Sequence, residues 1–153
     1  MIYQGSKKYP VEEIVLHCSA TMPSWMKDKP FKDQVAEITR WHVEDRGWKT
    51  IGYHWIISRE GDVLPGRPET VIGAGVLGHN SGVIHVCLIG GGGSSADDQF
   101  GDNFTDAQAA AVKAKIEDIK TRTTIRKITG HNEYAAKACP GFRVEKWMLS
   151  WGV

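Results

Sequence analysis

The apolar and polar positions along the 153-residue chain follow two periods, one typical of strands and the other typical of helices. The run EEIVLHC over 12–18 is rich in β-branched and aliphatic residues, ends at a polar turn and predicts a strand. A period of two places Ile14, Leu16 and Cys18 on one face of that strand. His17 then lies on the opposite face.

Four further segments have the composition of strands. GYHWIIS and VLPGR, over 52–58 and 63–67, are joined by the turn REGD and predict a hairpin. The strongly apolar run VIHVCLI over 83–89 predicts a central strand. TIRKIT, over 124–129, predicts a short strand near the C-terminal end of the chain.

Three segments carry apolar residues at helical spacing. The first covers 31–46 and ends at Gly47. The second begins at Thr105, where Gln108 completes a capping box ahead of AAAVKAKIEDI. The third is the amphipathic segment RVEKWMLSW over 143–151.

The remaining segments predict loops. GAGVLG, over 73–78, matches a dinucleotide-binding pattern, but a strand rather than a helix follows it, so a loop is favoured. The glycine-rich run over 90–103 has no helix-forming pattern and lacks the Gly-Lys-Ser/Thr ending of a phosphate loop. Strands and helices alternate over 1–153 without repeats or a linker. We therefore predict a single α/β domain with a central, mostly mixed β-sheet flanked by about three helices.

Composition narrows the classes of function. The 19 basic and 18 acidic residues leave a formal charge of +1, which implies no bulk attraction to nucleic acid. Three cysteines cannot all pair within one chain, which argues against a disulfide scaffold and indicates a reducing site of synthesis. The N-terminal MIYQGSKKYP has no apolar core for a secretory signal, and no apolar run approaches the length of a membrane span. We expect the protein to accumulate in the cytoplasm.

Candidate chemistry gathers in TGHNEYAAKACPGF, over 129–142. His131 and Cys139 are both residue types that bind Zn²⁺, and the loop between them lets their side chains converge. His17 is the best third ligand, because it ends a strand and sites in α/β sheets form at such ends. Two imidazoles and one thiolate leave an open fourth position, as in catalytic zinc sites. Spacing alone leaves open the alternative of a surface histidine and a buried cysteine without metal.

Lys137 and Tyr53 are weaker candidates on the residues alone. A lysine near a metal neutralises charge on a tetrahedral intermediate, but loop lysines are usually only solvated. Tyr53 is either an ordinary strand residue or a phenol aimed at the zinc-bound water. The residue types by themselves do not separate these alternatives.

Four blocks occur in a fitting order and spacing: LHCSAT at 16–21, RWHVEDRGW at 40–48, IGYHWIISREG at 51–61 and KACPGF at 137–142. Together they resemble the zinc-dependent N-acetylmuramoyl-L-alanine amidases of the phage T7 lysozyme type, which are relatives of the peptidoglycan recognition proteins. The resemblance extends over nearly the whole chain.

The resemblance implies a role for each candidate. His17, His131 and Cys139 correspond to the ligands of one Zn²⁺ per chain. Tyr53 corresponds to the tyrosine that contacts the zinc-bound water or the developing tetrahedral oxygen. Lys137 corresponds to the lysine that amidase activity needs near the scissile carbonyl.

The implied activity is that of an endolysin, a peptidoglycan hydrolase that cleaves the amide between N-acetylmuramic acid and L-alanine of the stem peptide. A monomer is expected, which would leave the host cytoplasm for periplasmic peptidoglycan once the inner membrane is permeabilised. The resemblance also implies two alternative functions: a module that binds muropeptides without cleaving them, and a regulator of an RNA polymerase. Cys139, Tyr53 and Lys137 argue against the first alternative, and the N-terminal segment matches the second poorly.

Two positions depart from the family pattern. Gly75 stands where relatives often carry a loop histidine, and His85 stands in a strand where relatives have glycine. A bulkier group must therefore be accommodated at 85. His85 and Cys87 share a strand face and are interpreted as packing residues.

The other histidines are expected to have structural roles. His42 is predicted to brace its helix against the turn that follows. His54 is predicted to pack in the core, since strand alternation points it away from Tyr53. His79 is either a solvated loop histidine or a substrate contact near the cleft.

Overall fold

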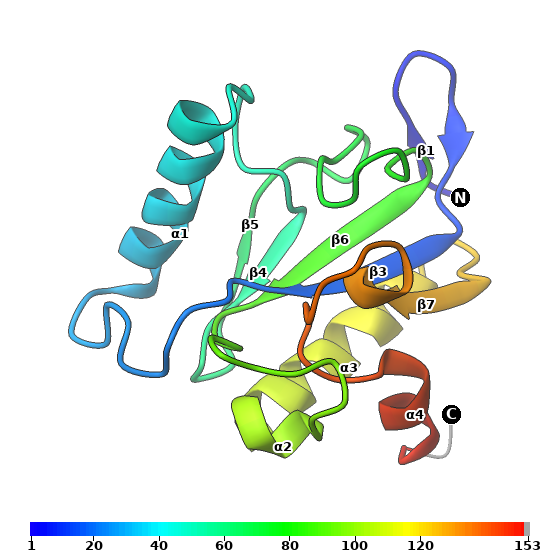
Figure 1. Cartoon of the computed structure of the whole chain (residues 1–153). Coiled ribbons are helices and arrows are strands. Elements are labelled where there is room, and N and C mark those ends of the chain that lie inside the picture. The colour runs from blue at the N-terminus through cyan, green and yellow to red at the C-terminus, as the bar shows by residue number, and fades with distance from the viewer. Residues whose placement is uncertain (152–153) are drawn as a thin grey trace.

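A five-stranded β-sheet organises the residues that the computed structural model describes, 1–151 (Figure 1). Its order is β5-β4-β6-β3-β7. The pairs β4–β6, β6–β3 and β3–β7 are parallel, and the hairpin pair β4–β5 is antiparallel, so the predicted mixed sheet is confirmed. The strands of this sheet are β3 (Glu13–Cys18), β4 (Trp55–Ile57), β5 (Val63–Pro65), β6 (Val83–Leu88) and β7 (Lys127–Gly130).

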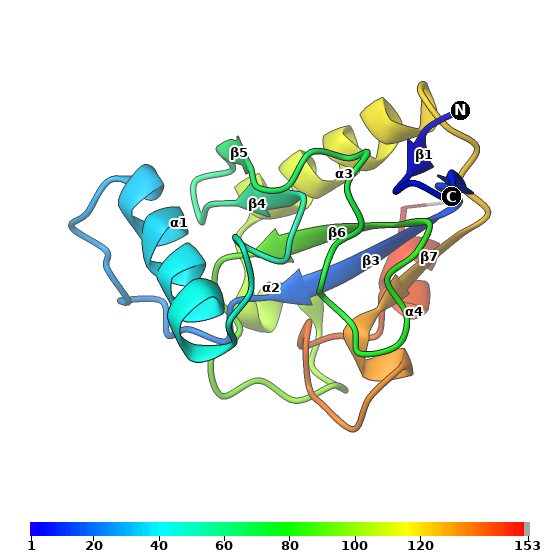
Figure 2. The ribbon, with the colours of Figure 1, turned by 90° about the horizontal axis from the view of Figure 1, so that it is seen from above.

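Helices cover the sheet unequally. α2 (Phe100–Asn103), α3 (Asp106–Lys120) and α4 (Val144–Leu149) lie against one face, with α3 running across it (Figure 1). α1 (Phe31–Arg40) and its π-helical continuation (Trp41–Asp45) stand at the β4 side of the sheet (Figure 2). None of the helices in the described part of the chain is both long enough and apolar enough to cross a membrane.

The period of two in β3 separates a core face from a polar face. Ile14 and Leu16 are fully buried and belong to the apolar cluster that Ile116 of α3 also joins. Burying one such side chain is worth about 1.5–3 kcal/mol, so the apolar face of β3 contributes directly to stability. Glu13 and His17 alternate with these residues and point to the side that α3 leaves uncovered.

Two segments differ from the sequence prediction. The loop expected over 90–103 contains the helical turn α2, so that expectation was wrong at its C-terminal end. Phe100 stacks on Trp147 with ring centroids 4.4 Å apart, and this tertiary contact compensates for a weak helical pattern. A small hairpin of β1 (Tyr3–Gln4) and β2 (Tyr9–Pro10) was not predicted, because strands of two residues carry no readable period.

The other predicted elements occur with small shifts of their ends. Thr105 and Gln108 form the predicted capping box at the start of α3. The predicted first helix ends as α-helix at Arg40 and continues as a π-helical turn. The GAGVLG segment, 73–78, is a loop with no helix after it, as expected.

Replacing Ile116 by alanine should destabilise the fold by about 2–5 kcal/mol, because it leaves a cavity between α3 and the sheet. Glu117→Ala, on the exposed side of the same helix, should change the free energy of unfolding by less than about 0.5 kcal/mol. Urea unfolding followed by circular dichroism measures both. Equal effects of the two variants would contradict this assignment of the core face.

Candidate metal centre and active-site cleft

His17, His131 and Cys139 come together from three separate segments. His17 is the second-to-last residue of β3, His131 opens the 3₁₀ turn that follows β7 (His131–Glu133), and Cys139 lies in the loop before α4. One ligand atom of each lies within 4.8 Å of the others, and His17 Nδ1 is 3.9 Å from Cys139 Sγ. Nitrogen and sulfur ligands of one tetrahedral zinc lie about 3.6 Å apart, so the donor set and its spacing fit that ion.

Burial sets the protonation states of these three side chains. It holds the pKa of His17 well below its usual value, and it lowers the pKa of His131 with help from the Lys137 ammonium. Both imidazoles are therefore neutral at pH 7, as metal ligation requires. A hydrogen bond with Cys18 and burial raise the pKa of the Cys139 thiol. A divalent cation would reverse that preference, because a coordinating thiol is deprotonated.

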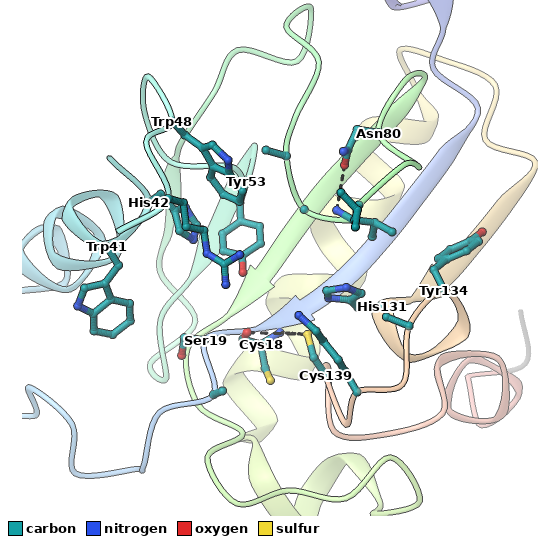
Figure 3. A pocket seen from close by; sticks show the side chains of 18 of the residues that line it. Cys18, Ser19, Trp41, His42, Trp48, Tyr53, Asn80, His131, Tyr134 and Cys139 are labelled. Carbon is teal, nitrogen blue, oxygen red and sulfur yellow. Dashed lines mark hydrogen bonds between the residues drawn. The ribbon is translucent and has the colours of Figure 1, made fainter. Parts of the chain in front are cut away.

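A cleft of about 890 Å³ opens beside this cluster (Figure 3). Trp41 and Trp48 line one side of it, and Tyr134 lines the other. Figure 3 shows the Tyr53 hydroxyl directed into the cleft, toward the side where His131 and Cys139 lie. A ligand in the cleft would therefore meet apolar walls and a few convergent polar groups, which is typical of small-molecule sites.

Lys137 and Tyr53, the two predicted catalytic residues, both line the cleft. Lys137 is exposed, and its backbone N–H donates to Ala135 O. The ring of Tyr53 lies 5.0 Å from that of His17. Burial raises the pKa of the Tyr53 phenol well above its usual value, so this hydroxyl stays a hydrogen-bond donor at neutral pH.

His42 braces the cleft wall, as predicted. Its ring packs 4.8 Å from Trp48 and 5.3 Å from Tyr53, and its Nδ1 accepts the Gly52 N–H at 2.9 Å. Burial and nearby cationic side chains lower the pKa of His42 to about 4. A neutral imidazole thus holds the turn before the tyrosine in place.

His54 and His79 also hold structural positions. His54 is fully buried as predicted; its Nδ1 accepts the His85 N–H, and its Nε2 lies 2.8 Å from Val71 O. His79 Nε2 lies 2.7 Å from Glu13 Oε1, and 34% of the His79 side chain is exposed. The carboxylate partner was not anticipated, and the choice between a solvated histidine and a substrate contact stays a prediction.

Glu13 is a buried carboxylate that holds the cleft-lining residue Tyr134, and the sequence analysis missed it. It is almost fully buried on the polar face of β3, and it accepts hydrogen bonds from Thr129 and Tyr134 at 2.6 Å each in addition to His79. Burial alone would raise the pKa of Glu13, but these hydrogen bonds outweigh it and lower that pKa. The carboxylate ties Tyr134 on one side of the cleft to His79 in the neighbouring loop. Its buried position in an apolar strand was the available signal.

His85 does more than fill space, which corrects its interpretation as a packing residue. The parallel register pairs it with Val15, so it shares a face with His17, and its Nδ1 lies 2.8 Å from His17 Nε2. A Cβ on Gly75 would lie 2.4 Å from that same His85 nitrogen. The two departures from the family pattern therefore meet at one contact. Cys87, on the same face, is fully buried.

The chain is similar in sequence to a known family of amidases. A model of the N-acetylmuramoyl-L-alanine amidase family matches residues 7–142. The endolysin of Escherichia phage T7 is 37% identical over 94% of this chain and 89% of its own length. The endolysin of Klebsiella phage KP32 is 36% identical with the same coverage. The chain belongs to the N-acetylmuramoyl-L-alanine amidase family.

Solved structures agree on the fold. The amidase LysC of Clostridium intestinale superposes with a TM-score of 0.72 at 21% identity, over 100% of this chain and 98% of that one. Bumblebee peptidoglycan recognition protein SA gives a TM-score of 0.75 at 22% identity, over 99% of this chain and 86% of that one. The predicted family and fold class are confirmed, and the chain is a peptidoglycan hydrolase of the amidase class.

Stability should fall steeply as the pH drops from about 6.5 toward 4. Burial lowers the pKa values of His17, His54 and His85, and that of His42 falls to about 4. Below pH 6.5 the unfolded chain binds protons that the folded chain refuses, which costs up to about 1.4 kcal/mol per pH unit for each such histidine. Urea midpoints measured with a chelator at pH 7, 6 and 5 test this.

The variant His42→Gln is the matched comparison for that titration. This variant lacks one of these histidines. Its free energy of unfolding should therefore fall less steeply with pH than that of the parent, by the contribution of one proton, which is up to about 1.4 kcal/mol per pH unit. A midpoint that stays level between pH 7 and 5 in the parent would contradict the assignment of neutral, buried imidazoles.

Proposed function

We propose that this amidase hydrolyses the bond between the lactyl group of N-acetylmuramic acid and L-alanine, using one Zn²⁺ held by His17, His131 and Cys139. The observation that carries the proposal is the gathering of these three donors within 4.8 Å of one another beside a cleft. Three ligands of this type leave one position open, which distinguishes catalytic from structural zinc sites. When bound, zinc supplies Lewis-acid chemistry: it makes water nucleophilic at neutral pH and polarises the carbonyl under attack.

Tyr53 is proposed to donate a hydrogen bond to the carbonyl oxygen as negative charge develops on it. Its raised pKa keeps the phenol protonated, and the rings of His17 and His42 restrict its orientation. A donor fixed before reaction stabilises a developing oxyanion without having to reorganise.

Lys137 is proposed to place its ammonium beside the same oxyanion. It lines the cleft two residues before Cys139, so its charge lies near the scissile amide when the stem peptide is bound. Electrostatic stabilisation of this kind acts mainly on the transition state and hence on kcat.

The hypothesis of RNA polymerase binding stays a prediction from the resemblance.

The trio of donors supports hydrolysis over a purely binding role, because a module that only binds muropeptides needs neither the thiolate nor an open metal position. The endolysin relatives support peptidoglycan as the substrate. We infer that the protein acts on periplasmic peptidoglycan once the inner membrane is permeabilised, and as a monomer.

The purified protein should contain about one zinc per chain, and it should release stem peptides with free L-alanine N-termini from peptidoglycan. Cys139→Ser should lower the zinc content, because a neutral hydroxyl is a poor ligand for this ion. Cys18→Ala removes a neighbouring thiol and should retain zinc. Metal analysis with mass spectrometry of the released muropeptides measures this, and full zinc content in Cys139→Ser would remove Cys139 from the ligand set.

Lys137→Ala should lower kcat on the order of 10²–10³-fold while zinc content stays unchanged, because an oxyanion-stabilising charge is lost. Lys146→Ala removes an exposed lysine on α4, outside the lining of the cleft, and matches the change in net charge. Initial rates on purified peptidoglycan separate the two variants. Near-normal turnover of Lys137→Ala with zinc bound would exclude the proposed role.

A further inference from the structure

A buried hydrogen bond joins the imidazoles of His17 and His85. The nitrogen atoms His17 Nε2 and His85 Nδ1 are 2.8 Å apart, and both side chains are fully buried. The rings come from adjacent parallel strands, β3 and β6, and their centroids are 4.9 Å apart. Strand pairing therefore fixes the distance between these two side chains.

The role of His17 Nδ1 determines which of the two histidines donates this hydrogen bond when a metal is bound. His17 Nδ1 is the nitrogen on the side of Cys139 Sγ, at 3.9 Å, so Nδ1 is the atom that would hold a metal shared with Cys139. The ring proton of His17 would then be on Nε2 and would need an acceptor. Ligand histidines usually donate this proton to a carboxylate, a carbonyl or water. In this chain the acceptor in place is His85 Nδ1, and His85 must carry its own proton on Nε2.

His85 is held rigidly for that task. Its backbone N–H donates to His54 Nδ1, and its backbone oxygen accepts the His54 N–H, at 2.9 Å each. The rings of His54 and His85 are stacked with an interplanar angle of 5°. His85 Nε2 has no hydrogen-bond partner among the described residues. Within residues 1–151 the side chain of His85 thus makes its hydrogen bond to His17 alone. With the proton on Nε2, that N–H is left unpaired in the core, a cost that the bond to His17 has to offset.

Gly75 provides the space for this contact. A Cβ at position 75 would lie 2.4 Å from His85 Nδ1 and 2.7 Å from His17 Nε2, directly against the two bonded atoms. Any larger residue at 75 must therefore displace one of the two rings. Position 75 therefore needs glycine because the two imidazoles leave no room for a side chain, and not because its backbone is left-handed.

We propose that His85 is a positioning residue for the metal centre: it accepts the His17 Nε2–H and thereby fixes the tautomer and orientation in which His17 Nδ1 meets the metal. The inference rests on the proposed function, in that His17 is taken as a metal ligand. Removing a hydrogen-bond partner of a ligand histidine typically lowers metal affinity about 10- to 100-fold.

The variants His85→Leu and His85→Asn test the proposal as a matched pair. Leucine has two carbon atoms at the δ position and no acceptor, whereas asparagine has an amide oxygen at the place of Nδ1. Zinc affinity, measured by competition with a chromophoric chelator, should fall about 10- to 100-fold in His85→Leu. It should recover to within a few-fold of the parent in His85→Asn, which a role in core packing alone would not produce.

The outcomes separate the inference from the proposed function. A folded His85→Leu that binds zinc as tightly as the parent, or a His85→Asn as weak as His85→Leu, would overturn the role of His85 and leave the ligand set intact. A parent protein that binds no zinc would overturn both. Circular dichroism in the presence of a chelator reports whether each variant folds.

A measurement on the parent protein covers the case in which the variants do not fold. In ¹⁵N–¹H correlation spectra of the zinc-bound protein labelled at histidine, His17 and His85 should both be neutral and both carry their proton on Nε2. A proton on His85 Nδ1 would make His85 the donor and overturn the proposal.

Discussion

The burial of β3 between β6 and β7 is the constraint on which the rest of the structure depends. All six residues of Glu13–Cys18 are buried, although two of them are a glutamate and a histidine. Most buried polar groups are hydrogen-bonded, because leaving one unpaired costs free energy. Glu13 meets this requirement through Thr129, Tyr134 and His79, and His17 meets it through His85. The side chains on the polar face of the sheet are therefore arranged so that they hydrogen-bond the two buried polar residues of β3.

The same strand separates stability from chemistry. Its apolar face joins the cluster under α3, so large side chains there contribute stability without touching the cleft. Its polar face holds one neutral imidazole, because burial keeps the pKa of His17 well below the usual range. Neutral imidazoles are what a metal needs from its ligands. The acid sensitivity expected of the fold and the metal binding proposed for it thus have one physical cause.

Local elements were readable from the sequence where the local signal is strong. The alternation in β3, the apolar run of β6 and the capping box at Thr105 were each correct, since period and capping act within a few residues. α2 was not readable, because Phe100 gains its stability from Trp147, a residue far along the chain. The β1–β2 hairpin was missed for the related reason that two-residue strands carry too little pattern.

The candidate site residues could be read from the sequence, since residue types and ordered motifs are visible in one dimension: His17, Tyr53, His131, Lys137 and Cys139. The residues that support them became visible only in three dimensions. Glu13 and His85 acquire their partners from strand register, and a shift of one residue would turn them to the other face. Register is set by pairing between segments about 70 residues apart, so no local pattern around His85 could reveal its contact with His17.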